Sequence, residues 1–77
     1  MSDESPIYYD PSTDSMYVRI RPGVKWDQIV DDDRDLVIDV SESGELVGYD
    51  IQHASEHMDV VAEAMALLRA QRRARAA

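Results

Sequence analysis

The chain contains no cysteine among its 77 residues. Disulfide bonds, thiolate metal sites and cysteine–histidine catalytic pairs are therefore excluded. Glycine-rich phosphate loops and serine nucleophile elbows are also missing from the sequence. No apolar run approaches the roughly 18 residues of a membrane-spanning helix. The first residues, MSDESP, are acidic and polar, unlike a signal peptide, so we expect a soluble cytoplasmic protein that has no cofactor and no membrane partner.

Basic residues are few, because 8 lysines and arginines face 16 aspartates and glutamates, and the formal net charge is −8. All acidic residues lie at or before Glu63, whereas half of the basic ones are the C-terminal arginines Arg69, Arg72, Arg73 and Arg75. The acidic body repels nucleic acid, which would have to use these arginines alone, and no aromatic residues lie between them for base stacking. We therefore expect a basic protein as partner rather than nucleic acid.

The short length of the chain limits its core. A chain of this size buries only about two thirds of its unfolded surface, so self-association is one way to add buried area. No linker or repeat is visible in the sequence. We predict a single domain over residues 1–77, with residues 1–6 frayed, a β-meander over residues 7–52 and a C-terminal helix over residues 55–73.

Alternation of apolar and polar residues indicates several short strands. The clearest case is the stretch 16–21, in which Met16, Val18 and Ile20 share one face and Tyr17 and Arg19 share the other. Turn-forming residues over 10–14 and at Pro22-Gly23 separate the neighbouring segments. The predicted strands are Ile7–Tyr9, Met16–Arg21, Val24–Val30, Leu36–Val40 and Glu45–Gln52, with an acidic loop over Asp31–Asp35.

The last two strands form a predicted hairpin, in which Gly44 takes the left-handed position that closes a four-residue loop. This loop pairs Val40 with Glu45, Ile38 with Val47, and Leu36 with Tyr49. One face then holds Leu36, Ile38, Val40, Val47, Tyr49 and Ile51. The other face holds Val37, Asp39, Leu46, Gly48 and Asp50, and it places Asp39 opposite Leu46 and Asp50 opposite Asp35.

A helix follows the hairpin, from Glu56 to Arg73. Ser55 is the predicted N-cap, and acidic residues in the first turn complement the helix dipole. The apolar stripe of this helix consists of Met58, Val61, Met65 and Leu68. The sequence therefore predicts an α+β fold, a small antiparallel β-meander of four to five strands with one C-terminal helix packed on one face.

Several motifs resemble a family of short bacterial proteins that is known as a domain of unknown function, number twenty-two eighty-three. Tyr9-Asp10-Pro11, Asp14 and Met16-Tyr17-Val18-Arg19 resemble its "YD-x-x-x-D-x-LYI-x" opening. Val37-Ile38-Asp39, Gly44-x-Leu46-Val47-Gly48 and Asp50-Ile51-x-x-Ala54-Ser55 resemble its "VIVDYDEDGRLVGIEILDAS" segment.

The resemblance covers residues 7–55 and implies a small β-rich fold with a terminal helix. It brings no established activity and no catalytic residues. Some members of the family lie beside small toxin-like proteins, which implies an antitoxin-like role. The chain departs from the family pattern over Val24–Asp35, which is unusually acidic and carries Trp26.

Two groups of residues are candidates for a metal or catalytic site. His53 and His57 match the H-x-x-E-H pattern of zinc peptidases, although a helix that starts at Ser55 leaves His53 outside it, and ordinary surface histidines account for the pair. Asp35, Asp39 and Asp50 would share one face of the hairpin, where carboxylates bind a hard cation or transfer protons. A solvated sheet face accounts for the same aspartates.

The preferred interpretation is a non-enzymatic interaction module that forms a homodimer through a sheet edge or face and binds a basic protein. The alternative is a small metal-binding or hydrolytic protein that uses the aspartates and histidines above. The candidate interface residues are Tyr17, Arg19, Trp26, Val37 and Leu46. The residues predicted to shape the fold are Gly44, Gly48 and Ser55.

Overall fold

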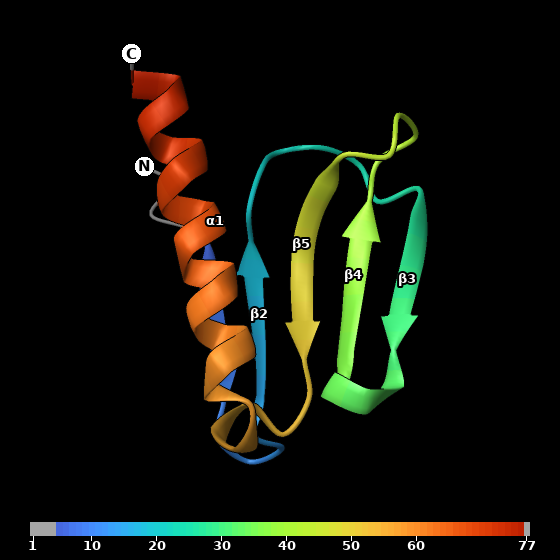
Figure 1. Ribbon diagram of the computed structural model, residues 1–77, viewed down its shortest axis with the longest axis vertical. Helices are drawn as coiled ribbons and strands as arrows, with labels where there is room; N and C mark the ends of the chain where they lie inside the picture. Colours follow the sequence, from blue (N-terminus) through green and yellow to red (C-terminus); the bar gives the residue numbers. More distant parts are fainter. Residues whose placement is uncertain (1–4, 77) are drawn as a thin grey trace.

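The computed structural model describes residues 5–76 of the chain. The strands are β1 (Ile7–Asp10), β2 (Ser15–Arg19), β3 (Asp27–Asp31), β4 (Leu36–Val40) and β5 (Leu46–Ile51). Two short 3-10 helices, η1 (Asp32–Arg34) and η2 (Ala54–Glu56), precede β4 and the helix α1 (Met58–Ala76) respectively. The prediction of an α+β fold with an antiparallel sheet and one C-terminal helix is confirmed (Figure 1).

The strand order in the sheet is β1-β2-β5-β4-β3, which differs from the sequential order of a simple meander. After β2 the chain crosses the upper end of the sheet to reach the far edge, and β5 then returns to lie between β4 and β2 (Figure 1). β5 is the strand most suited to the central place, because its Val47, Tyr49 and Ile51 are all buried. The edges of the sheet are β1 and β3.

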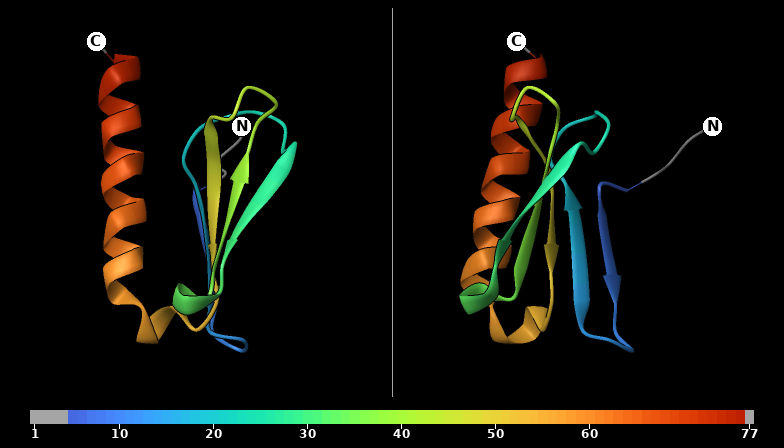
Figure 2. Two further views of the ribbon diagram at one scale, coloured as in Figure 1. Left: turned by 45° about the vertical axis from the view of Figure 1, so that its right-hand side comes forward. Right: turned by 90° about the vertical axis from the view of Figure 1, so that its right-hand side faces the viewer.

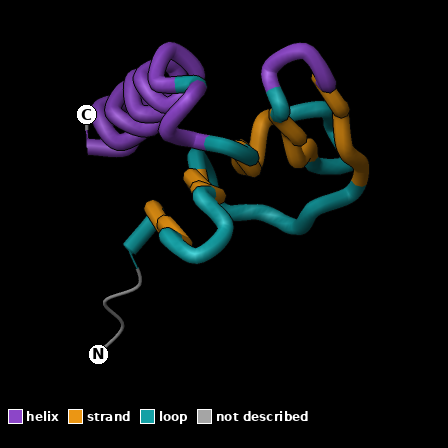
Figure 3. Tube along the Cα trace, turned by 90° about the horizontal axis from the view of Figure 1, so that it is seen from below, coloured by secondary structure: helices purple, strands orange, loops and turns teal. Residues whose placement is uncertain are grey.

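Helix α1 lies on one face of the sheet, and it contacts mainly β2 and β5 (Figure 2). Figure 3 looks along the strands and shows the helix on one side of their row, while the described residues place no element on the other side. The core between the helix and the sheet includes Val18, Leu36, Ile51, Val60, Ala64 and Leu68. Met58 was predicted to belong to the buried stripe of the helix, and this is wrong. It is the first helical residue and is 62% exposed.

The hairpin register differs from the predicted one. Ile38 pairs with Tyr49 and Leu36 with Ile51, and the register shifts by one residue between Asp39 and Val40 because of a bulge. The hairpin loop is one residue longer than predicted and the bulge adds a further residue to β5, so the pairs beyond the bulge are displaced by two positions in this strand and most side chains keep their predicted face. Gly44 has a φ of 89°, and its N–H donates to the carbonyl oxygen of Ser41 at 2.9 Å.

The bulge also exchanges two neighbouring side chains. Leu46 was predicted on the face opposite the helix, but it packs against the core cluster. Val47 was predicted to face the helix. It is only 2% exposed yet is not part of that cluster, and its Cγ2 lies close to Gly23 in the β2–β3 connection. A classic bulge breaks the alternation of side chains, which explains why the strict period of two is wrong at this point.

The remaining predicted boundaries shift by a few residues. β3 begins at Asp27 instead of Val24, and the predicted acidic loop contains η1. Of the predicted frayed segment, residues 1–4 lie outside the described residues, while the carbonyl oxygen of Pro6 accepts a hydrogen bond from the N–H of Arg19 at 2.7 Å. Among the described residues, no helix is long and apolar enough to cross a membrane.

Candidate functional site

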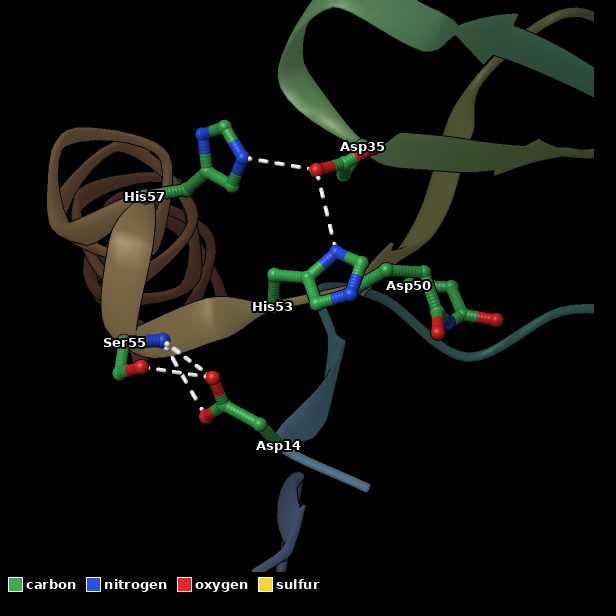
Figure 4. Close-up of polar contacts among 7 residues, drawn as sticks. Asp14, Asp35, Asp50, His53, Ser55 and His57 are labelled. Carbon is green, nitrogen blue, oxygen red and sulfur yellow. Dashed lines mark hydrogen bonds and ion pairs between the residues drawn. The ribbon is translucent and has the colours of Figure 1, made fainter.

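Three of the candidate site residues meet where η2 leads into the helix. Asp35, directly before β4, accepts contacts from both imidazoles through one carboxylate oxygen, Oδ2 (Figure 4). The Nε2 of His57 lies 3.0 Å from this oxygen, and the Nδ1 of His53 lies 3.2 Å from it. These contacts hold the pKa of the Asp35 carboxyl below its usual value, with the His57 contact as the larger cause.

Unusual backbone conformations bring these residues together. Asp14, Asp35 and His53 are the non-glycine residues with positive φ in the described chain, at 56°, 50° and 52°. The backbone of two of these residues also contacts the segment around η2. The carbonyl oxygen of Asp35 accepts a hydrogen bond from the N–H of Gln52, and that of Asp14 accepts one from the N–H of Ala54, both at 2.8 Å. Left-handed conformations cost free energy, so these hydrogen bonds are needed to maintain them.

Ser55 has a role different from the predicted N-cap. The helix begins three residues later, and the last residue before it is His57, whose carbonyl oxygen accepts from the N–H groups of Val60 and Val61. The Ser55 hydroxyl instead donates to Oδ2 of Asp14 at 2.6 Å, and its N–H points to the same carboxylate. This contact lowers the pKa of Asp14, as does a hydrogen bond from the hydroxyl of Tyr9.

In the histidine cluster, the carboxylate of Asp35 joins the residue before β4 to the two histidines on either side of η2. A histidine–aspartate pair that serves in covalent catalysis needs a protein nucleophile beside the imidazole. Among the described residues, no hydroxyl group donates to either histidine, since the nearby Ser55 donates to Asp14. His53 lies outside the helix and His57 directly before it, so the pair is not one turn apart as the zinc peptidase pattern requires. No group of three or more described His, Asp or Glu residues has the arrangement of a metal site.

Asp39 and Asp50 lie apart from this cluster. Asp50 pairs with Val37 instead of Asp35, and its Oδ1 accepts a hydrogen bond from Nε2 of Gln52. Asp39 pairs with Gly48 instead of Leu46 and is only 7% exposed. The shifted register removes the predicted pair of Asp35 and Asp50, whereas Asp39 and Asp50 remain on the open sheet face, both beside Tyr17.

The buried Asp39 belongs to a polar group on the sheet face opposite the helix. Its Oδ2 accepts a hydrogen bond from the hydroxyl of Tyr17 at 3.1 Å, and Lys25 lies 4.0 Å from Oδ1. Burial and the adjacent Asp39 carboxylate raise the pKa of Tyr17. The Tyr17 ring crosses Gly48, where a Cβ atom would collide with the end of the ring in its observed position.

A second polar network, which sequence reasoning missed, connects η1, β5 and the helix. The hydroxyl of the buried Tyr49 donates to Oε2 of Glu63 at 2.6 Å, and Arg34 contacts Oε1 of Glu63 at 3.1 Å and Asp31 at 2.9 Å. Burial, reinforced by Glu63, raises the pKa of Tyr49 to about 12. The only signal of this network in the sequence is Tyr49, a tyrosine among otherwise apolar inward-facing residues of the strand.

The candidate interface residues are distributed unevenly. Tyr17 and Val37 are partly buried, and they pair with Asp50 in one row across the open sheet face. Arg19 is exposed and donates to the carbonyl oxygen of Gly23 at 3.1 Å. Trp26 is 66% exposed beside β3, and Leu46 packs on the core as described above.

Sequence reasoning missed the most exposed apolar residues of the sheet edges. Ile29 and Val30 of β3 are 54% and 60% exposed, and Tyr8 of β1 is 66% exposed. Both strands are outer strands, so each presents backbone hydrogen-bonding groups to solvent on one side. The two edges are therefore the most prominent candidate binding surfaces of the described residues.

Comparison with family models gives a match over residues 7–55 to the family described as "Protein of unknown function (DUF2283)". The matched segment extends from the first residue of β1 to Ser55 in η2 and contains every strand of the sheet. No curated protein and no solved structure matches the chain.

Proposed function

We propose that this chain, which belongs to the DUF2283 family, is a non-enzymatic interaction module that binds a basic protein segment as an additional strand at the β3 edge. The observation that carries this proposal is the composition of that edge. Ile29 and Val30 are more than half exposed at the centre of the strand, and an aspartate stands at each end. Strand addition at an open edge uses backbone hydrogen bonds for affinity and alternate side chains for specificity.

The side chains of β3 define the partner. Asp27, Ile29 and Asp31 alternate along the strand and so share one face, the face on which Ile29 pairs with Ile38. An antiparallel partner strand would match Asp27 with a basic residue and Ile29 with an apolar one. A basic residue opposite Asp31 would share that carboxylate with Arg34, which lies 2.9 Å from it. Each cross-strand pair of opposite charge contributes about 0.2–1 kcal/mol, and the net charge of −8 accelerates the approach of a basic partner. A small basic toxin has this chemistry, which supports an antitoxin-like role.

A second copy of the chain fits the opposite edge better. Antiparallel pairing of two β3 strands about Ile29 would place Asp27 against Asp31 in both halves, and like charges opposite each other are destabilising. Pairing of two β1 strands about Tyr8 would instead match Tyr8 with Tyr8 and Ile7 with Tyr9. We therefore propose that the homodimer forms through β1 and leaves β3 free for the partner.

The β3 proposal is tested with a peptide that carries lysine, valine and lysine at alternate positions, followed through the backbone amide signals of the protein in NMR spectra. We expect the largest shifts in β3 and none with a peptide in which glutamate replaces lysine. Shifts of equal size with both peptides, or shifts confined to other elements, would contradict the proposal.

The dimer is tested by light scattering on a size-exclusion column at micromolar concentration. We expect a dimer for the wild type, a monomer for Tyr8→Asp, and a dimer for the matched variant Val30→Asp on the other edge. A monomeric wild type, or dissociation by Val30→Asp alone, would contradict the assignment of the dimer to β1.

A further inference from the structure

An apolar pocket of about 200 Å³ lies between β1 and the start of α1. It is lined by Tyr9, Met16, Ala54, Ser55, Met58 and Val61. Charged residues make up 31% of the chain, yet no described acidic or basic residue lines this pocket. β1 is an outer strand, so the pocket lies at an edge of the sheet. It is therefore an apolar surface at the edge of a highly charged protein.

The strand register and a hydrogen bond place the walls of this pocket. Tyr9 pairs with Met16, and Met16 pairs with the buried Ile51, so these side chains lie on the sheet face that the helix covers. The hydroxyl of Tyr9 donates to Asp14 at 2.8 Å, which holds the ring in place. Met58 lines the pocket from the first turn of α1. Tyr9 is 43% exposed and Met58 is 62% exposed, so the pocket rim presents two large apolar side chains to solvent.

The outer side of β1 carries the backbone groups that a second copy needs. The carbonyl oxygen of Pro6 accepts a hydrogen bond from an N–H of β2 at 2.7 Å, and hydrogen-bonded pairs alternate along an antiparallel ladder. The backbone groups of Tyr8 therefore point to β2, whereas those of Ile7 and Tyr9 point away from it. In agreement, the N–H of Ile7 contacts the hydroxyl oxygen of Ser5 at 3.2 Å instead of β2. Two β1 strands that pair about Tyr8 would thus exchange hydrogen bonds between Ile7 and Tyr9.

We propose that a second copy of the chain covers this apolar pocket, so that the dimer contact extends beyond the paired strands. This inference rests on the β1 dimer proposed above. In that pairing, Ile7 of the second copy lies opposite Tyr9 on the helix-covered face, beside the pocket rim. A stable interface buries about 1,200–2,000 Å² in total, and two paired strands of four residues supply only part of this area. The rim formed by Tyr9 and Met58 adds apolar area, and it does so twice in a two-fold dimer.

The test is the dissociation constant of the dimer, measured by sedimentation equilibrium of the full chain. Met58→Asp should raise this constant about ten-fold, because it places a charge where the dimer buries an apolar side chain. An aspartate in the first turn complements the helix dipole, so the circular dichroism spectrum should be unchanged. Met58→Leu should keep the wild-type constant. Val24→Asp is the matched control, because it adds the same charge at an apolar residue that is 81% exposed and does not line the pocket.

The possible outcomes separate this inference from the dimer on which it rests. A ten-fold weaker dimer in Met58→Asp, with little change in Val24→Asp, supports the covered pocket. A dimer that Tyr8→Asp dissociates, but that Met58→Asp and Val24→Asp weaken equally, would overturn the covered pocket and keep the β1 dimer. A wild type that is monomeric at micromolar concentration would overturn both.

Discussion

The ring of Tyr17 lies directly across Gly48 on the neighbouring strand, and its hydroxyl reaches the buried Asp39 on the strand beyond. A Cβ atom at position 48 would lie 2.6 Å from Cζ of Tyr17 and 3.1 Å from the carbonyl oxygen of Val18. The three central strands β2, β5 and β4 are thus connected by one side chain on the face that the helix leaves open. Glycine at this position makes room for the Tyr17 ring in its observed position.

Gly48→Ala should destabilise the protein by about 1–3 kcal/mol, because the added methyl group displaces the Tyr17 ring and its hydrogen bond. Urea unfolding measures the change. In a Tyr17→Ala background the same substitution should cost much less, since the ring is gone. Equal costs in both backgrounds would show that the collision with Tyr17 is not the cause.

Ser55 and Asp14 should be coupled although 41 positions separate them. A double-mutant cycle of Ser55→Ala and Asp14→Asn is expected to show that the two effects on the free energy of unfolding are not additive, as for residues in direct contact. If Ser55 instead served only as a helix cap, the two effects would be additive within about 0.5 kcal/mol.

Acid should destabilise the protein through Asp35 and Asp14, whose pKa values are lowered in the folded state. Below the ordinary carboxyl pKa of 3.8 the unfolded chain binds more protons at these groups, so their contribution is complete above this value and is lost as the pH falls through the folded-state pKa. Thermal unfolding between neutral and acid pH measures the loss. In Asp35→Asn the melting temperature should fall less at acid pH than in the wild type. Substitution of the exposed Asp33 should leave the fall in melting temperature unchanged.

Alkali should destabilise the protein through Tyr49, because the pKa of this residue is raised from 10.0 to about 12 in the folded state. The stabilisation is complete below the unfolded-state pKa and disappears as the pH rises toward 12. Absorbance titration of the tyrosines should show that the group that titrates last is missing in Tyr49→Phe and present in Tyr8→Phe. Loss of the late group in Tyr8→Phe instead would contradict the assignment.

The elements that depend on local periodicity could be predicted from the sequence. Alternation over residues 16–20 indicates β2 with Val18 and Ile20 inward, and both are buried. The helix was predicted from its apolar residues, but its start was placed at the wrong residue because Ser55 is engaged by Asp14, a distant residue that no local pattern reveals.

The candidate site depended on contacts between distant parts of the chain. Asp35 meets His53 and His57 because Asp35 and His53 adopt left-handed conformations, and sequence patterns assign these to glycine first. Asp39 and Asp50 pair with other residues than predicted because the hairpin loop is one residue longer and β5 carries one bulge. The strand order was also beyond prediction, since β5 pairs with β2, a strand that lies three connections earlier in the chain.

The central claim is that β3 recognises a basic strand. It is tested most directly by a variant in which the charges of β3 are reversed, because its preference between peptides should then reverse as well. Asp27→Lys combined with Asp31→Lys should abolish calorimetric binding of the lysine–valine–lysine peptide and create binding of its glutamate counterpart, because each cross-strand charge pair changes sign. The dimer should persist, as β1 is unchanged. A variant that keeps the wild-type preference for the lysine peptide would contradict the claim.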